Sequence, residues 1–225
     1  MNDYLSDEQQ VEVIRRWWSE NGTVILAGVG LGVLGLFGWN RYQAATETTA
    51  AEASAVYERL VDAVADGNAD LAIASQQELV RDFDGTPYAD QAWLAVAKLH
   101  MDDGDTEAAA EALRSALTAV DDPTLERVAR LRLARVLLYD GAPDEARELI
   151  AGVDAGYLDA RRNEILGDIE LARGDIEAAR AAYQAALATP GNPPLIDINL
   201  VTMKLNDLPP AAVSDAAEAS GEGDS

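Results

Sequence analysis

The sequence predicts an all-α protein in which a single N-terminal transmembrane helix precedes a solenoid of helical hairpins. Three observations support this fold class. The 225-residue chain is rich in alanine and only 6% aromatic, which favours helices over strands. Residues 21–40 carry no charge over a length that can span a bilayer. Glycine-centred turns then recur at Gly104, Gly141 and Gly174, 37 and 33 residues apart, as they do in helical repeats.

The composition excludes several kinds of catalytic and binding site. There is no cysteine and His100 is the single histidine, so thiolate nucleophiles, disulfides and histidine clusters for metals are impossible. The formal net charge of −23 argues against nucleic-acid binding, because phosphates require a basic surface. The run from Asp102 to Asp105 resembles a calcium loop but lacks its ligand spacing, so we interpret it as a turn and a helix cap. We therefore expect a protein-binding protein with no enzymatic activity, cofactor or metal.

Residues 1–20 are predicted to form a cytoplasmic or interfacial segment. Val11, Ile14, Trp17 and Trp18 lie at helical spacing, which is typical of a short helix at a membrane surface. A cleaved signal peptide is the alternative, but its N-terminal region should be basic. Here five acidic residues outnumber two arginines, and no small-residue cleavage site follows the apolar run closely. A retained membrane anchor fits these flanks better.

The transmembrane helix itself is assigned to residues 21–40. At about 1.5 Å per residue, twenty residues cover the roughly 30 Å hydrocarbon core of a bilayer. Trp39 stands at its end, where aromatic side chains meet the interface. Arg15 and Arg16 precede the span and Arg41 follows it. Because basic residues stay on the cytoplasmic side, this excess predicts a cytoplasmic N-terminus and a repeat domain on the opposite side.

Three glycines of the span share one helix face. Gly28, Gly32 and Gly35 recur at i, i+4 and i+7, and small residues at this spacing let a second helix approach closely. The functional interpretation is a site that packs against a partner transmembrane helix. The alternative is that glycine is simply tolerated in membrane spans. The sequence leaves both open.

Residues 41–55 are small and polar, and they form either a linker or the exposed start of a long helix. The repeat domain is assigned to residues 56–208. Each of its three turns has a glycine that ends one helix, followed by Asp105, Pro143 or Asp175 at the start of the next. A degenerate hairpin begins near Tyr57 and turns at Gly67-Asn68.

The repeats resemble tetratricopeptide repeats at several fixed positions. The third repeat has the pattern's Leu-Gly pair, turn glycine, alanines and aromatic residue at Leu166, Gly167, Gly174, Ala179, Tyr183 and Ala186. The first has matching residues at Trp93, Ala97, Gly104, Ala109, Leu113 and Ala116. The second has Leu133, Ala134, Gly141, Ala146 and Ile150, but Arg130 stands where tryptophan is expected. The resemblance implies a tetratricopeptide-like helical-hairpin solenoid.

The chain as a whole resembles the YfgM family, the ancillary subunit of the bacterial SecYEG translocon. The resemblance covers about residues 8–208, and its most specific parts are Val-Glu-Val-Ile-Arg-Arg-Trp-Trp-Ser-Glu-Asn-Gly (11–22) and Met-Lys-Leu-Asn-Asp-Leu (203–208). It implies a single-pass protein of the bacterial inner membrane with a periplasmic repeat domain. It also implies association with SecYEG and with the membrane-anchored periplasmic chaperone PpiD. The role implied is that of an adaptor that helps newly translocated proteins pass to periplasmic chaperones.

Two other functions fit the same architecture. One is a cell-envelope or cell-division scaffold that uses the same repeats. The other is a regulator with the opposite topology, which would capture cytoplasmic partners. The acidic tail 209–225, which has no basic residue, is a departure from the family and is predicted to be disordered.

The concave face of the solenoid is a candidate partner-binding groove, because the first helix of each hairpin lines this face in such repeats. The positions assigned to it in the first two repeats are Leu94, Lys98, Met101, Leu131, Arg135 and Leu138. They combine an apolar stripe with a basic pair, which predicts binding of a segment with an apolar face and an acidic group. In the alternative, the apolar residues are core and both cations pair with surface carboxylates. Unchanged partner binding after Lys98→Glu and Arg135→Glu would exclude the groove.

Overall fold

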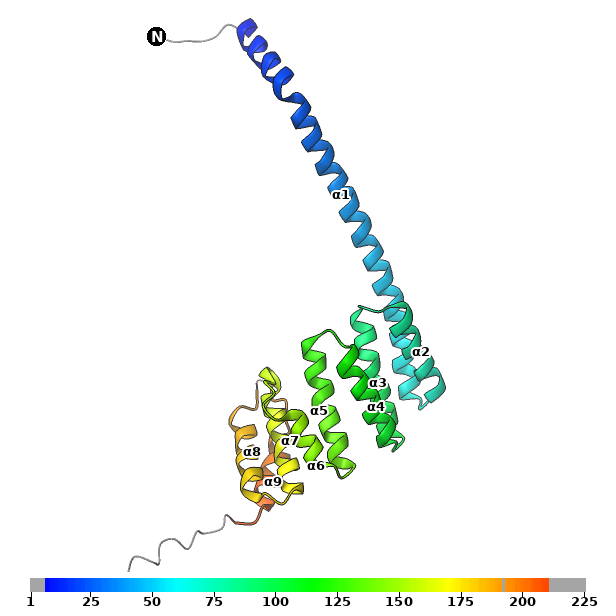
Figure 1. Ribbon diagram of the computed structural model, residues 1–225, viewed down its shortest axis with the longest axis vertical. Coiled ribbons are helices and arrows are strands. Elements are labelled where there is room, and N and C mark those ends of the chain that lie inside the picture. The colour runs from blue at the N-terminus through cyan, green and yellow to red at the C-terminus, as the bar shows by residue number, and fades with distance from the viewer. Residues whose placement is uncertain (1–6, 192, 211–225) are drawn as a thin grey trace, which may run out of the picture. The chain divides into compact units, whose positions relative to one another are not determined.

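The computed structural model describes residues 7–191 and 193–210, and the regular structure within these ranges is entirely helical, as predicted. The elements are α1 (Asp7–Ala65), α2 (Ala69–Asp82), α3 (Pro87–Asp102), α4 (Thr106–Ala119), α5 (Pro123–Tyr139), α6 (Pro143–Ile150), the 3₁₀ turn η1 (Gly156–Leu158), α7 (Asp159–Ala172), α8 (Ile176–Ala188) and α9 (Ile198–Asp207) (Figure 1). From residue 211 on, the predicted acidic tail lies outside the described residues.

Helix α1 belongs to two structural units. The contacts within the chain divide it between Glu52 and Ala53, and the second unit contains the last turns of α1 together with α2–α9. The sequence left open whether residues 41–55 are a linker or helix, and the structure shows them as helix within α1. Alanine and glutamate, which are strong helix formers, are frequent in this stretch.

In the first unit, α1 presents apolar side chains around its surface. Val24, Leu31 and Leu36 are each more than 70% exposed. Among the described residues, α1 is the helix whose length and apolar composition suffice to cross a membrane. A helix with apolar residues on all sides belongs against lipid or other helices rather than in water. These exposed side chains are therefore expected to contact lipid.

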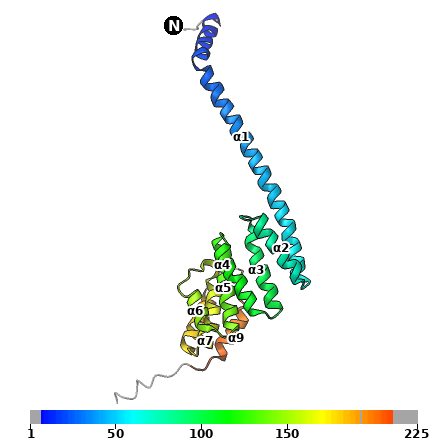
Figure 2. The same cartoon turned by 45° about the vertical axis from the view of Figure 1, so that its right-hand side comes forward.

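The second unit is a stack of helical hairpins. Figure 1 shows α2–α9 packed in chain order, Figure 2 shows the same stack turned, and the most extensive contacts join each helix to its neighbours along the chain. At the three predicted turns, Gly104, Gly141 and Gly174 have φ values of 79°, 80° and 82°, which are the left-handed conformations that end a helix. Asp105 and Asp175 then accept hydrogen bonds from backbone amides of α4 and α8 at 2.9 Å. These caps confirm the interpretation of the Asp102–Asp105 run as a turn.

The degenerate hairpin predicted near Tyr57 is also formed. Gly67 has a φ of 68°, and Asn68 caps α2 by accepting a hydrogen bond from the amide of Leu71 at 3.1 Å. The ring of Tyr57 lies 5.7 Å from that of Tyr88, which joins the end of α1 to α3. The end of α1 thus forms the first helix of a fourth hairpin.

The hairpins share a core of leucine and alanine. Leu60, Leu79, Leu99 and Leu113 are each at most 1% exposed and belong to one cluster that continues to Ile169. Many of the fully buried members of this cluster are alanines, whose small side chains let helices pack closely. The hairpins from the end of α1 to α7 therefore pack closely on one another.

The C-terminal end has a second core centred on Tyr183, which is 0% exposed. Its ring packs against Gly167, and its hydroxyl donates a hydrogen bond to Asp168 at 2.7 Å. Burial, and then the neighbouring carboxylates, raise the pKa of Tyr183, so the hydroxyl remains a donor. Lys204 of α9 contacts the two Asp168 oxygens at 2.7 and 2.8 Å and lies over the Tyr183 ring. Lys204 belongs to the closing 203–208 motif, and it ties α9 to the last hairpin.

The turn glycines lead to a stability prediction. Replacing Gly174 with alanine should lower the free energy of unfolding by about 1–2 kcal/mol, because a Cβ is disfavoured at a φ of 82°. Replacing it with asparagine should cost less, since asparagine tolerates the left-handed region better. Thermal unfolding of the full chain in detergent would check both. Equal losses for the two variants would contradict this explanation.

Candidate partner-binding groove

The first helices of three hairpins, α3, α5 and α7, surround an open cavity of about 590 Å³. Contacts between α3 and α5 and between α5 and α7 place these helices side by side. The walls are mostly apolar and carry a few charged side chains. The lining residues are Ala97, Lys98, Met101, Leu113, Arg132, Arg135, Val136, Leu138, Tyr139 and Asp168.

A second cavity of about 540 Å³ continues the groove toward the N-terminal hairpin. Lys98 and Arg132 line both cavities, so the two meet at these side chains. The second cavity is bordered by the end of α1 through Tyr57, Val61 and Val64. Together, the two cavities form one groove on the face made by the first helices of the hairpins.

The structure brings together four of the six residues predicted to form the groove. Lys98, Met101, Arg135 and Leu138 line the larger cavity. Leu94 borders the second cavity but is only 6% exposed, so it serves chiefly as core. Leu131 was assigned to the groove and is instead a core residue: it is 5% exposed and lines neither cavity. Helix α5 is rotated relative to the orientation that the sequence predicted. As a result, Arg132 lines both cavities and Val136 lines the larger one.

The predicted basic pair is already engaged in ion pairs. Lys98 pairs with Asp102, one helical turn further on, and both side chains are more than half exposed. Arg135 contacts Glu164 of α7 at 3.3 Å. Both cations therefore have a carboxylate partner, but only Lys98 has the surface partner that the alternative expected. Glu164 is a buried carboxylate rather than a surface one, with a residue exposure of 3%.

Arg132 is the groove cation that the sequence interpretation missed. The described residues place no carboxylate within 4.0 Å of its guanidinium, and its one hydrogen bond is a long one of 3.5 Å to the carbonyl oxygen of Leu94. Burial lowers the pKa of Arg132, although arginine stays charged at neutral pH. A signal was present in the sequence, because Arg132 precedes Arg135 by three residues and so shares its helix face.

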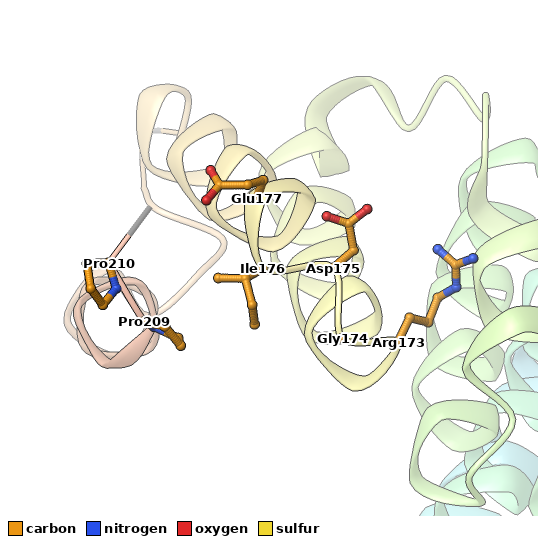
Figure 3. A pocket seen from close by; sticks show the side chains of 7 residues that line it. All are labelled: Arg173, Gly174, Asp175, Ile176, Glu177, Pro209 and Pro210. Atoms are coloured by element: carbon orange, nitrogen blue, oxygen red, sulfur yellow. The ribbon is translucent and has the colours of Figure 1, made fainter. Parts of the chain in front are cut away.

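A wider cavity of about 630 Å³ lies between the turn before α8 and the prolines after α9 (Figure 3). Two of its three charged groups, Arg173 and Asp175, already have structural roles. Arg173 points away from Pro209 and Pro210 in Figure 3 and pairs with Asp144 at 2.7 Å and with Glu170 at 2.6 Å. Asp175 caps α8, so Glu177 is the remaining charged lining residue, and a single carboxylate does not make a binding site.

The glycine face of the span is open. A Cβ added at Gly28, Gly32 or Gly35 would meet no atom within 4 Å. The face therefore has room for a second helix, and that role stays a prediction. In the described part of the chain, no group of three or more histidine, aspartate or glutamate side chains is arranged to hold a metal ion.

Comparison with known proteins agrees with this architecture. Residues 15–210 match a family described as a tetratricopeptide repeat-like domain. The chain is 32% identical over 204 residues to a protein of Haemophilus influenzae, covering 91% of this chain and 98% of that protein. It is 31% identical over 208 residues to a protein of Escherichia coli K12, covering 92% and 99% of the two chains. A protein of Aggregatibacter actinomycetemcomitans is 32% identical over 206 residues, covering 91% and 98%.

All three of these proteins are named ancillary SecYEG translocon subunit, a name that describes a subunit rather than an enzyme. The similarity extends over the apolar helix and the repeats alike, because it covers almost the full length of each relative. The chain therefore belongs to the family of ancillary SecYEG translocon subunits, membrane-associated proteins with a tetratricopeptide repeat-like domain.

Proposed function

We propose that this protein is a single-pass adaptor of the bacterial inner membrane that associates with the SecYEG translocon. Its N-terminus would lie in the cytoplasm and its repeat domain in the periplasm, where it helps newly translocated proteins pass to periplasmic chaperones. The observation that carries the proposal is the near full-length similarity to named translocon subunits. A membrane-anchored chaperone like PpiD is the expected second partner.

The two structural units would divide this work. The apolar part of α1 would hold the protein in the bilayer, with Gly28, Gly32 and Gly35 available to a transmembrane helix of the translocon. The groove between α3, α5 and α7 would bind a segment of another protein. Neither step needs bond-making chemistry, which fits the expectation of a protein without enzymatic activity.

Site-specific photocrosslinking tests the proposed partners. A photoreactive residue at Leu31 or Leu36 would sample neighbours in the membrane, and one at Tyr139, 77% exposed at the groove, would sample partners of the repeats. We expect adducts with translocon subunits from the span and with a membrane-anchored chaperone or translocated chains from Tyr139. The buried Leu60 is the control and should give none. Adducts confined to cell-division proteins would favour the scaffold function instead.

The absence of native cysteine makes the topology directly measurable. Tyr139→Cys and Glu12→Cys each introduce one thiol at an exposed position, on opposite sides of the apolar segment. We expect a membrane-impermeant maleimide to label the cysteine at position 139 on intact spheroplasts, and the one at position 12 only after lysis. The reverse pattern would contradict the periplasmic placement and favour a cytoplasmic regulator.

A further inference from the structure

We propose that Arg132 is the anion-binding centre of the groove and recognises a side-chain carboxylate in a peptide segment of a partner protein. Apolar side chains on both sides of that carboxylate would fill the two cavities that meet at Arg132. The inference rests on the proposed adaptor function and deepens it, because it names the chemistry of the bound segment.

The first argument is the lack of a carboxylate partner for Arg132. Its guanidinium can donate five hydrogen bonds, yet the described residues supply one, at 3.5 Å from the Leu94 carbonyl. Between residues 53 and 210, nine of the twelve arginines pair with a described carboxylate, and of the three that do not, Arg132 is the one that lines the groove. Burial lowers the pKa of Arg132, but the residue as a whole is exposed, so an incoming anion can reach it. An accessible arginine with one long hydrogen bond has donors free to bind an incoming anion.

The second argument is the charge around it. Glu164 balances Arg135 at 3.3 Å, Arg161 at 3.0 Å and Lys204 at 3.5 Å, so one carboxylate faces three cations. Asp168 also lines the larger cavity, but its oxygens accept hydrogen bonds from Tyr183 and Lys204. The groove is therefore locally positive in a protein with a net charge of −23.

The third argument is the apolar surface on either side of Arg132. Met101, Val136 and Leu138 line the larger cavity, and Val61 and Val64 line the smaller one. A segment with the order apolar, acidic, apolar matches this succession of surfaces. The charges also select against other segments. A segment with a basic side chain would be repelled by Arg132. An acidic segment without apolar neighbours would be repelled by the negative protein surface and would gain no apolar contacts in return.

Selection from a peptide library tests the inference without a known partner. Randomised 12-residue peptides, fused at their C-terminal ends to a carrier so that only side-chain carboxylates are available, would be selected on the full chain in detergent. We expect Asp or Glu flanked by apolar residues to be enriched. The best peptide would then be synthesised with an amidated C-terminus, and its acidic residue replaced by the corresponding amide. This change should weaken binding about tenfold, as measured by fluorescence anisotropy.

Two variants locate the effect. The Arg132→Gln variant should bind the acidic and the amide peptide with equal affinity. That affinity should match the one that the unchanged protein has for the amide peptide. The control is Arg127→Gln, on the same helix, because Arg127 also has no ion pair with any described residue and lines neither cavity. That variant should retain the tenfold preference. An undiminished preference in Arg132→Gln would overturn the inference, and so would a selection that yields no acidic peptides.

Two further measurements separate the alternatives. If acidic peptides are selected only after residues 211–225 are removed, the groove holds this chain's own C-terminal carboxylates, which would overturn the assignment to a partner. Copurification of the translocon with Arg132→Gln tests the adaptor function separately. If the translocon copurifies but peptides show no carboxylate preference, the inference fails while the proposed function stands. If the translocon is absent even with the unchanged protein, the function fails instead.

Discussion

Replacing Gly167 with alanine is expected to lower the free energy of unfolding of the repeat domain by roughly 3 kcal/mol. A Cβ at this position would lie 2.4 Å from two carbons of the Tyr183 ring, far inside van der Waals contact. The ring cannot easily move aside, because Tyr183 is 0% exposed and its hydroxyl is bonded to Asp168. The two helices that pack most extensively, α7 and α8, would have to separate. Chemical denaturation of the full chain in detergent would measure the loss.

A double-mutant cycle provides the control for this prediction. Tyr183→Ala removes the ring and is itself destabilising, but adding Gly167→Ala to it should then cost little, since the clash is gone. Gly35→Ala places the same extra methyl group where no atom lies within 4 Å, and it should leave the repeat domain unaffected. Additive costs in the cycle would mean that the ring is not what requires glycine at position 167.

Replacing Lys204 with methionine is expected to cost about 2 kcal/mol. Methionine keeps much of the side-chain volume but removes both contacts to Asp168 and the one to Glu164. Glu164 is buried, and Asp168 would be left with the Tyr183 hydroxyl as its partner among the described residues. The change also frees α9 from the last hairpin, so hydrogen exchange should rise first in α9 and α8. Thermal unfolding and exchange rates would check this together.

The other lysine is a matched control. Lys98 forms an ion pair with Asp102 on the same helix, and the two side chains are 62% and 55% exposed. Exposed pairs of this kind contribute less than about 0.5 kcal/mol, so Lys98→Met should scarcely change stability. Equal losses at the two positions would indicate that the network around Asp168 does not hold α9 in place.

The hairpins could be predicted from sequence because local chemistry determines them. A glycine that ends one helix and an aspartate that caps the next act within a few residues, so the turns at Gly104 and Gly174 were found where they were expected. Gly167 and Tyr183 were recognised through the spacing of the repeat, although the sequence alone does not reveal how tightly they pack.

The sequence could not predict which charged side chains of the groove are paired, because the partners are far apart in the chain. Arg135 pairs with Glu164, 29 positions away, and Asp168 with Lys204, 36 positions away. Leu131 and Arg132 are adjacent, and a small rotation of α5 decides which of them enters the core. Periodicity gives the face of a helix only to within about one residue, so it selected the wrong neighbour.

The order of contacts in the stack has a consequence for how the protein forms. The extensive contacts join helices that are at most two positions apart in the chain, from α2·α3 to α8·α9. Each hairpin can therefore complete its packing as soon as the next one has been synthesised, without waiting for the C-terminus. The last helix of the described residues is α9, whose Lys204 joins two carboxylates that would otherwise remain on an open edge. A chain stalled before α9 should therefore hold folded early hairpins and a dynamic final one.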